Sequence, residues 1–169
     1  MTDRKPGRTP SQTVGPYLHI GLREGRGPMR ASTLTRPIVI SGRLFDGAGT
    51  GIGDGVVEFW AKGFDAIGRV WTEADGSYRL ITCKPQARTD ADGSMHSPHL
   101  AVRVLARGIL TQYITRVYFA DETTNDRDLI LGAVPANRRD TLIAAAIADA
   151  EYRFDIVVQG DRETVFFAV

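Results

Sequence analysis

Few side chains in this sequence could bind a metal ion or act as a base at neutral pH. The histidines are His19, His96 and His99. His96 and His99 are three residues apart, a spacing that puts two side chains on one face of a helix. The residues around them predict loop and strand instead, where side chains three apart point to opposite sides. The spacing therefore disfavours a paired metal site, and the alternative is that both are hydrogen-bonding histidines with a structural role.

Other signatures of catalysis or ligand binding are weak. No set of serine, histidine and aspartate typical of nucleophilic hydrolysis can be recognised, because a serine next to a histidine, as in His96-Ser97, carries little information. Glycine occupies every second position from Gly47 to Gly55, a pattern of turns and not of a phosphate-binding loop. The single cysteine, Cys83, cannot form an intramolecular disulfide and lies in an apolar stretch, which favours a small buried side chain over a reactive thiol.

The composition is that of a globular protein with one core. The chain has 169 residues, of which 43% are hydrophobic and 24% charged, with a net charge of +1. No cluster of lysine and arginine is present, so we expect no nucleic-acid partner. The first 12 residues are polar and lack the apolar core of a signal peptide, and no apolar run is long enough to cross a bilayer. We therefore expect a cytoplasmic location and no membrane partner.

The elements that must position these residues are mostly strands. Prolines at positions 6, 10, 16, 28 and 37 predict that residues 1–37 form an extended N-terminal arm, followed by one domain over residues 38–169. Residues 38–45 and 56–60 are rich in β-branched and aromatic side chains and predict strands. Three hairpins are predicted around glycine-containing turns. They pair residues 69–72 with 77–82, residues 99–105 with 112–119, and residues 152–159 with 164–167.

One short helix is predicted in the C-terminal half. The run from 142 to 150 is rich in alanine, the residue with the highest helix propensity, and Asp140 or Thr141 stands near its start as an N-cap. Short strands at regular spacing with glycine turns between them are typical of a β-sandwich or barrel. From composition and pattern alone, the sequence predicts a mainly β domain and no particular activity.

A series of short motifs resembles the intradiol ring-cleavage dioxygenases, in the same order and over nearly the whole chain from Thr9. The first motif is Thr9-Pro10-Ser11-Gln12-Thr13-Val14-Gly15-Pro16-Tyr17, and residues 42–47, 57–60 and 75–78 follow it. Residues 98–100, 105–109, 115–122, 138–144, 152–156 and 163–167 resemble the α subunits of protocatechuate 3,4-dioxygenases in particular. The resemblance implies a β-sandwich of the intradiol dioxygenase type, in agreement with the strand pattern.

The resemblance also implies where the metal is bound. In this family one non-haem Fe(III) is held by two tyrosinates and two histidines, all from the β subunit, in part within motifs of the form Gly-Pro-Tyr-Pro-Trp and His-Ile-His. Here Lys84-Pro85-Gln86 stands at the tyrosine motif and His99-Leu100-Ala101 at the histidine motif. An alanine methyl group has no lone pair to donate to iron. We therefore expect that this chain binds no metal or other cofactor and contains no catalytic residue.

The resemblance assigns this chain a part in substrate binding. The residues that match family positions in the active-site cavity of the β subunit are Thr13, Gly15, Pro16, Tyr17 and Arg107. A rigid Gly-Pro wall suits a flat aromatic ring, and a guanidinium group suits the carboxylate of an anionic substrate. The alternatives are that Pro16 only stiffens the arm and that Arg107 is a surface charge on a hairpin bend.

The expected function is that of the α subunit of an enzyme that opens the ring of protocatechuate with O₂ and forms 3-carboxy-cis,cis-muconate. The expected partners are the β subunit, protocatechuate and O₂, in a higher-order assembly of αβ units. One departure concerns the outer rim of the assembly: only ten residues separate Trp60 from Trp71, and Trp60-Ala61-Lys62 replaces the familiar Trp-Gln-Ala. Two alternatives remain open, a purely structural scaffold subunit of the same complex and an independent ligand-binding sandwich.

Overall fold

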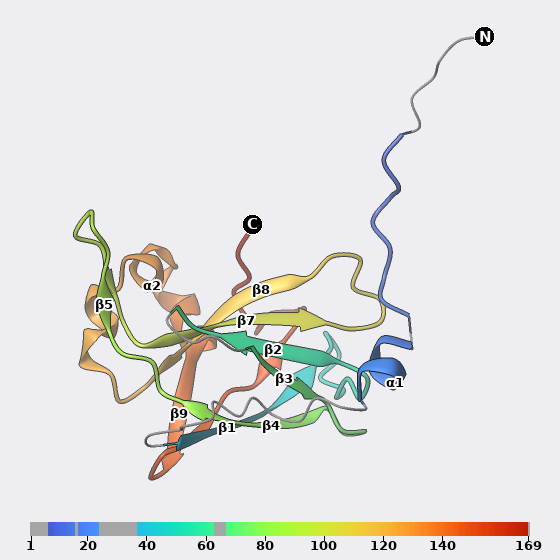
Figure 1. The fold of residues 1–169 in the computed structure, drawn as a ribbon, viewed down its shortest axis with the longest axis horizontal. Helices are drawn as coiled ribbons and strands as arrows, with labels where there is room; N and C mark the ends of the chain where they lie inside the picture. Colours follow the sequence, from blue (N-terminus) through green and yellow to red (C-terminus); the bar gives the residue numbers. More distant parts are fainter. Residues whose placement is uncertain (1–6, 16, 24–36, 63–66, 169) are drawn as a thin grey trace.

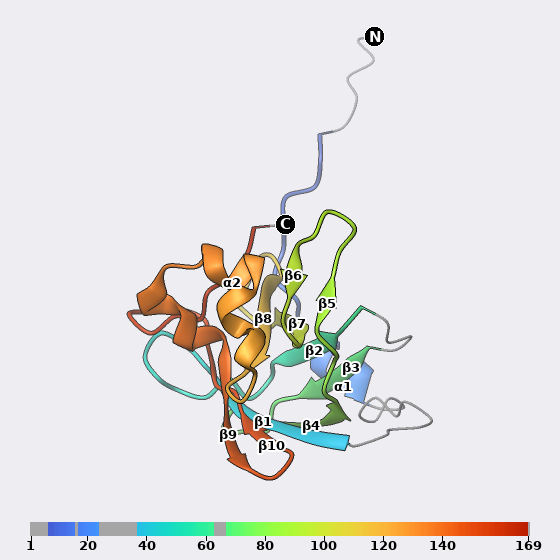
Figure 2. The ribbon, with the colours of Figure 1, turned by 90° about the vertical axis from the view of Figure 1, so that its left-hand side faces the viewer.

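The fold consists of two packed layers of strands. The computed structural model describes residues 7–15, 17–23, 37–62 and 67–168. Nine strands follow one another in the order β11-β1-β10-β9-β8-β7-β2-β3, with β4 added beside β1. Figures 1 and 2 show β7, β8 and β2 in one layer and β1 and β4 in the other. The bounds are β1 Pro37–Phe45, β2 Val56–Trp60, β3 Gly68–Trp71, β4 Ser77–Cys83, β7 His99–Leu105, β8 Tyr113–Phe119, β9 Ile143–Ala148, β10 Glu151–Arg153 and β11 Ile156–Val157.

The core lies between these layers because the strands alternate buried and partly exposed side chains. Along β7, for example, Leu100, Val102 and Val104 are almost completely buried, and the residues between them are not. Alternation with a period of two directs one face of a strand into the core. A smaller second core contains Tyr118, Leu131, Val134 and Leu142, and it lies on the other face of β8. It is closed by α2 Leu129–Ala133 and η2 Ala136–Leu142, and η1 Thr123–Arg127, which has no buried residue, precedes them.

The predicted strands at 38–45 and 56–60 are confirmed, and so is the hairpin of residues 99–105 with 112–119, which is the antiparallel pair of β7 and β8. The hairpin predicted for residues 69–82 is wrong. Its turn exists, because the amide of Gly76 donates to the carbonyl oxygen of Glu73 over 2.8 Å. However, β3 pairs with β2 and β4 pairs with β1, so the two segments belong to different layers. A turn signal defines the reversal of the chain but not the partner of each strand.

The third predicted hairpin is only partly correct. Residues 152–159 contain parts of β10 and β11, and both strands pair with β1 in parallel. The segment after Gly160 turns back, and the amide of Thr164 donates to the carbonyl oxygen of Val157 over 2.9 Å. It forms no strand there. Residues 165–167 lie beside β8, where the hydroxyl of Thr115 donates to the carbonyl oxygen of Val165 over 2.6 Å and the amide of Phe167 donates to that of Ile114 over 2.7 Å.

The helix predicted at 142–150 is wrong. Ile143–Ala148 is strand β9, which begins parallel to β8 and continues antiparallel to β10. Pairing with two neighbours outweighs the helix propensity of alanine, which is a weak preference of a few tenths of a kcal/mol per residue, roughly. The short helix of the C-terminal half is α2, which is N-capped by Asp128. Two further short strands, β5 Arg88–Thr89 and β6 Met95–His96, form a separate two-stranded ribbon.

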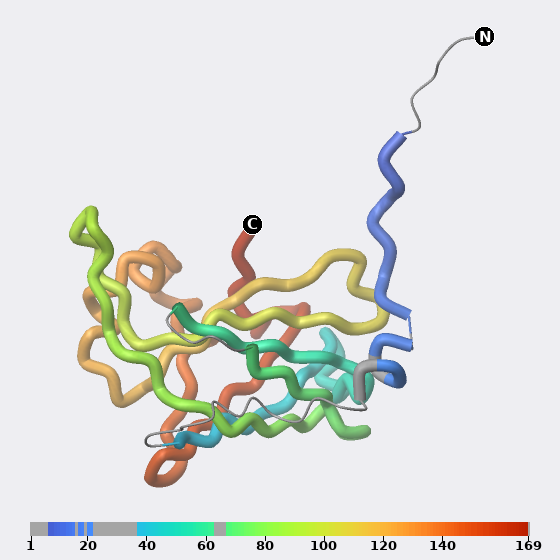
Figure 3. Tube along the Cα trace, viewed as in Figure 1, coloured from blue at the N-terminus to red at the C-terminus, as the bar shows by residue number. Residues whose placement is uncertain are grey.

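The N-terminal arm is not extended throughout, because Tyr17–Arg23 forms helix α1. Figure 3 shows residues 7–15 leading away from the body at the end of the molecule that holds the β7–β8 connection. The described residues do not include 24–36, so the predicted division of the chain after residue 37 stays a prediction. The side chain of His19 also lies outside the described part. Among the described residues, no helix is both long and apolar enough to span a membrane.

Candidate functional site

The connection between β7 and β8 presents Arg107 to solvent at one end of the molecule. The chain reverses directly after this residue, where the amide of Ile109 donates to the carbonyl oxygen of Ala106 over 3.3 Å. Gly108 has a φ of 83°, a left-handed conformation that glycine adopts without steric cost. The side chain of Arg107 is 63% exposed. The fold therefore holds the backbone of this turn in place and leaves the guanidinium group accessible.

The arm is attached to this same turn through Thr13. The amide of Gly108 donates to the hydroxyl oxygen of Thr13 over 2.8 Å, and this hydroxyl lies 3.5 Å from the carbonyl oxygen of Ala106 as a donor. Thr13 thus contacts both sequence neighbours of Arg107, Ala106 and Gly108, although Thr13 and Gly108 are 95 residues apart in the sequence. The structure brings together two of the predicted site residues, Thr13 and Arg107.

The other predicted arm residues lie just beyond this contact. The carbonyl oxygen of Gly15 accepts a hydrogen bond from the amide of Leu18 over 3.1 Å, which begins α1. Tyr17 is the first residue of α1, and its side chain is 81% exposed. Pro16 lies outside the described residues. The structure therefore places Gly15 and Tyr17 next to the Thr13 contact, with the phenol ring of Tyr17 directed away from the core.

Asp54 is a neighbour of this site that the sequence analysis missed. Its carboxylate oxygen Oδ2 forms an ion pair with Nε of Arg107. Asp54 lies in the turn of residues 53–55 before β2, and the sequence pattern identified that stretch only as a connection. No local signal pairs two residues that are 53 positions apart. The alternating glycines around Asp54 indicated a turn there but not the pairing with Arg107.

His99 begins β7 in a half-buried position, where its imidazole has a structural partner. Its Nδ1 lies 2.7 Å from the carbonyl oxygen of Ser97, which can only accept, so Nδ1 carries the proton and donates. Burial lowers the pKa of His99 to about 4, and the positive charge of Arg116 acts in the same direction. The ring is therefore neutral at pH 7. Its ring packs against that of Tyr118, with 5.3 Å between the ring centroids and 40° between the ring planes.

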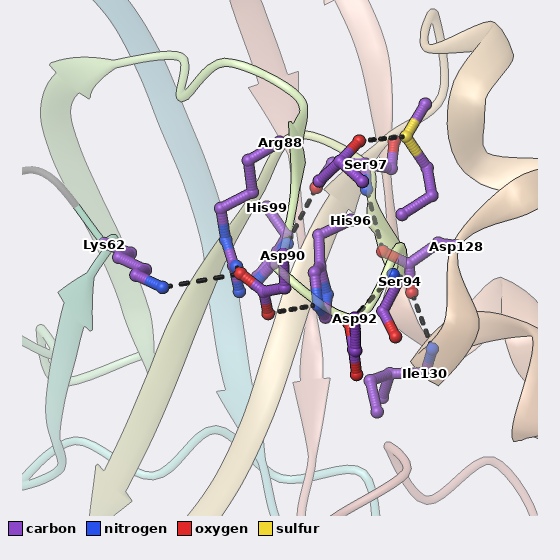
Figure 4. Close-up of polar contacts among 12 residues, drawn as sticks. Lys62, Arg88, Asp90, Asp92, Ser94, His96, Ser97, His99, Asp128 and Ile130 are labelled. Carbon is purple, nitrogen blue, oxygen red and sulfur yellow. Dashed lines mark hydrogen bonds and ion pairs between the residues drawn. The ribbon is translucent and has the colours of Figure 1, made fainter.

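The prediction that His96 and His99 point to opposite sides is wrong. Their ring centroids are 6.1 Å apart, because β6 ends at His96 and the chain bends before β7 begins. Figure 4 shows the two imidazole rings close together in one group of polar side chains, with Lys62 and Arg88 directed at Asp90. Nε2 of His96 lies 3.0 Å from Oδ2 of Asp90. The carboxylate of Asp90 is also paired with Arg88 and Lys62, so this cluster holds its own counter-ions.

The donor set around His99 does not fit a metal ion such as iron. Ala101 pairs with Arg116 on the neighbouring strand, and a guanidinium beside the site opposes a bound cation. The phenol oxygen of Tyr118 donates to Asp128 over 3.0 Å, and Asp128 also accepts from Ser97, Ile130 and Leu131. In the described part of the chain, no group of three or more histidine, cysteine, aspartate or glutamate side chains could hold a metal ion.

Comparison with known protein sequences identifies close relatives, although no family model matches the chain. The protocatechuate 3,4-dioxygenase alpha chain of Burkholderia cepacia is 38% identical, over 96% of this chain and 98% of the relative. The alpha chain of the same enzyme from Pseudomonas putida is also 38% identical, over 94% of this chain and 95% of the relative. The beta chain from Burkholderia cepacia is 27% identical over 75% of this chain and 66% of its own length.

Comparison with solved structures finds the same fold in intradiol dioxygenases. The dioxygenase domain of a dioxygenase and carbohydrate-binding fusion protein from Streptomyces sp. SirexAA-E has a TM-score of 0.60 at 26% identity, over 91% of this chain and 99% of the domain. Catechol 1,2-dioxygenase from Acinetobacter sp. ADP1 has a TM-score of 0.58 at 16% identity, over 83% of this chain and 60% of its own, which is a likeness in fold alone.

Proposed function

The chain belongs to the family of protocatechuate 3,4-dioxygenase α chains, and on this basis we propose that it is the α subunit of an intradiol dioxygenase acting on protocatechuate. The enzyme opens the aromatic ring with O₂ between the two hydroxyl-bearing carbons, and the product is 3-carboxy-cis,cis-muconate. The partner is the β subunit, and αβ units associate further. The chain supplies none of the groups that react with O₂.

The β subunit holds the iron in this proposal. Held there, Fe(III) would be chelated by the two oxygens of the catecholate and would supply the activation of the bound substrate toward O₂. The support from this chain is chemical: Ala101 and Gln86 stand at positions of family ligands, Ala101 has no donor atom, and Gln86 is exposed in a segment that Lys84 anchors through Asp121 and Glu122. His99 uses one ring nitrogen for the carbonyl oxygen of Ser97, and burial together with the charge of Arg116 on the neighbouring strand lowers the pKa of its imidazole.

The contribution of this chain is to shape the substrate pocket of the β subunit from one side. The observation that carries this proposal is the hydrogen bond from the Gly108 amide to Thr13, because it fixes the arm on the turn that carries Arg107. The arm residues Gly15 and Pro16, followed by Tyr17, form a wall for the aromatic ring. The exposed guanidinium of Arg107 binds the substrate carboxylate, which a charged and planar group does well.

Replacement of Arg107 tests this role in the αβ complex. Arg107→Ala removes a charge-assisted hydrogen bond to the carboxylate, a contact worth roughly 1.5–3 kcal/mol. We expect KM for protocatechuate to rise by about 10- to 100-fold with little change in kcat, since the contact is made in the ground state and transition state alike. Arg153→Ala is the matched control, because Arg153 is an exposed arginine paired with Asp155 over 3.0 Å on β10. An unchanged KM would remove Arg107 from the substrate pocket.

A second candidate function, a purely structural scaffold for the β subunit, is favoured by the surface of the β9–β10 hairpin. From Ala145 to Ala148 every side chain of β9 is exposed, although all four are apolar. An exposed apolar strand of this kind is typical of a contact between chains. The two functions differ in their response to substitution at Thr13 and Pro16. A scaffold would show altered assembly and unaltered kinetics, whereas the pocket role requires altered KM.

A further inference from the structure

Asp54 lies in a turn that the fold holds firmly. The amide of Thr72 donates to the carbonyl oxygen of Gly55 over 3.0 Å, and the amide of Gly55 donates to the hydroxyl of Thr72 over 2.8 Å. A methyl group added to Gly55 would lie 2.5 Å from Cδ2 of Leu44, and one added to Gly53 would lie 2.9 Å from the carbonyl oxygen of Ala74. A side chain at Gly53 would meet the backbone of Ala74, and one at Gly55 would displace the Leu44 side chain, so close contacts on both sides hold the backbone that carries Asp54.

Among the described residues, the pairing between Asp54 and Arg107 involves the Nε side of the guanidinium group. Oδ2 of Asp54 contacts Nε of Arg107. A guanidinium has five N–H donors in a planar fork, and the edge formed by its two terminal amino groups can bind a second carboxylate with two parallel hydrogen bonds. The side chain of Asp54 is 21% exposed and that of Arg107 is 63% exposed, so the acidic partner lies inside and the arginine lies outside.

This arrangement determines which way Arg107 points. Arginine has many rotamers on an exposed turn, and only a fraction of them would place the terminal amino groups correctly for a ligand. The apparent affinity for a ligand falls in proportion to the fraction of the protein that is in the competent conformation. A fixed carboxylate on Nε raises this fraction, because it holds the guanidinium by its inner side and leaves the outer edge free.

We propose that Asp54 is a positioning residue for Arg107, which presents the outer edge of the guanidinium to the carboxylate of an aromatic substrate. The proposal rests on the function proposed above, in which Arg107 contacts that carboxylate. Asp54 itself does not touch the substrate. It acts through Arg107 alone, so its effect disappears when Arg107 is absent and when the ligand has no carboxylate.

The test uses the αβ complex with four forms of this chain: unchanged, Asp54→Asn, Arg107→Ala and the double variant. Asparagine keeps the shape of the side chain and removes its charge. We expect Asp54→Asn to raise KM for protocatechuate by about 3- to 10-fold with kcat within about twofold, less than the effect of Arg107→Ala. We expect the double variant to match Arg107→Ala, because residues that act through one contact are not additive.

Catechol, which lacks the carboxylate, is the internal comparison for each preparation. We expect the inhibition constant of catechol to be the same in all four complexes. The readout is the ratio of KM for protocatechuate to this inhibition constant, and a loss of folded protein or of partner binding would not change that ratio. Asp54→Glu restores the charge, and we expect it to recover part of the lost affinity for protocatechuate.

Three results would overturn the role of Asp54. These are an unchanged or lowered KM in Asp54→Asn, an additive double variant, or an equal change for catechol and protocatechuate. The outcomes also separate the two proposals. If Arg107→Ala leaves KM unchanged, the pocket role of Arg107 fails, and the role of Asp54 fails with it. If Arg107→Ala raises KM and Asp54→Asn does not, only the positioning role fails.

Discussion

At the scale of single residues, His99 is an imidazole with a structural role in the fold. Its protonated nitrogen donates to the carbonyl oxygen of Ser97, and its ring packs against Tyr118. The carboxylate of Asp128 accepts hydrogen bonds from the Tyr118 hydroxyl and from three backbone amides, and it is almost completely buried. His99 is therefore part of a hydrogen-bonded cluster that joins β7, β8 and α2.

The lowered pKa of His99 predicts a loss of stability in acid. The imidazole titrates at about 4 in the folded chain and near its ordinary 6.5 when unfolded, so the unfolded state binds the proton first. The contribution of the neutral ring is complete above pH 6.5 and is lost as the pH falls toward 4, by on the order of 2–3 kcal/mol. Urea unfolding of the chain between pH 7 and pH 4 measures this loss.

His99→Asn is the matched variant, because its amide can still donate to Ser97 but does not titrate in this range. Between pH 7 and pH 4 the unfolding free energy of the unchanged chain is expected to fall by more than that of the variant. Parallel pH dependences in the two chains would contradict the lowered pKa.

The residues of the candidate site were predictable only in part. Thr13 and Arg107 came from resemblance, and the structure shows why they belong together, since the Gly108 amide joins the arm to the turn. Asp54 could not be predicted in the same way. Its partner is set by how the β1–β2 connection meets the turn of the β7–β8 hairpin, and neither segment contains a local signal for that contact.

At the scale of the elements, the β9–β10 hairpin shows where local propensity loses to pairing. The turn between the two strands passes through Ala150, whose φ is 56°. A residue with a Cβ atom pays roughly 1–2 kcal/mol for this left-handed conformation. The hairpin keeps it because the carbonyl oxygen of Ala150 accepts a hydrogen bond from the amide of Val39 over 2.8 Å, which joins the turn to β1.

Ala150→Gly is therefore expected to stabilise the chain. Glycine removes the steric cost of the left-handed conformation and adds back some unfolded-state entropy, for a net gain of about 0.5–1 kcal/mol. Ala148→Gly is the control within the same hairpin, because Ala148 lies in β9 and glycine weakens a strand by roughly 0.5–1 kcal/mol. Urea unfolding midpoints decide the matter, and a destabilising Ala150→Gly would mean that the turn is not strained.

Strand positions were predictable from alternation and turn residues, but strand partners were not. The pair β7 and β8 could be predicted because one connection with a turn at Gly108, residues 106–112, joins two strands with clear alternation. A glycine-containing turn also joins β3 and β4, yet the two strands belong to different layers. The amide of Thr72 donates to the carbonyl oxygen of Gly55, and β3 pairs with β2. Long-range pairing of this kind depends on the whole sandwich and leaves no mark in a short window of sequence.

At the scale of the whole molecule, two features indicate that the chain functions within an assembly. Exposed large apolar side chains lie on α1 and on the β7–β8 connection, namely Tyr17, Ile20 and Leu110. A second apolar surface lies on β9, where Ile147 is exposed among alanines. The first of these surfaces adjoins the contact between Thr13 and the turn of Arg107. Figure 1 shows α1 and the β7–β8 connection at the same end of the molecule.

The measurement that tests the central claim most directly is the iron content and ring-cleavage activity of this chain, purified alone and after co-expression with the β chain from the same genome. We predict that the chain alone contains no stoichiometric iron and does not cleave protocatechuate, and that both properties appear in the co-expressed complex. Stoichiometric iron and cleavage of protocatechuate by the chain alone would contradict the account, because the iron would then have to be bound by a different set of ligands in this chain.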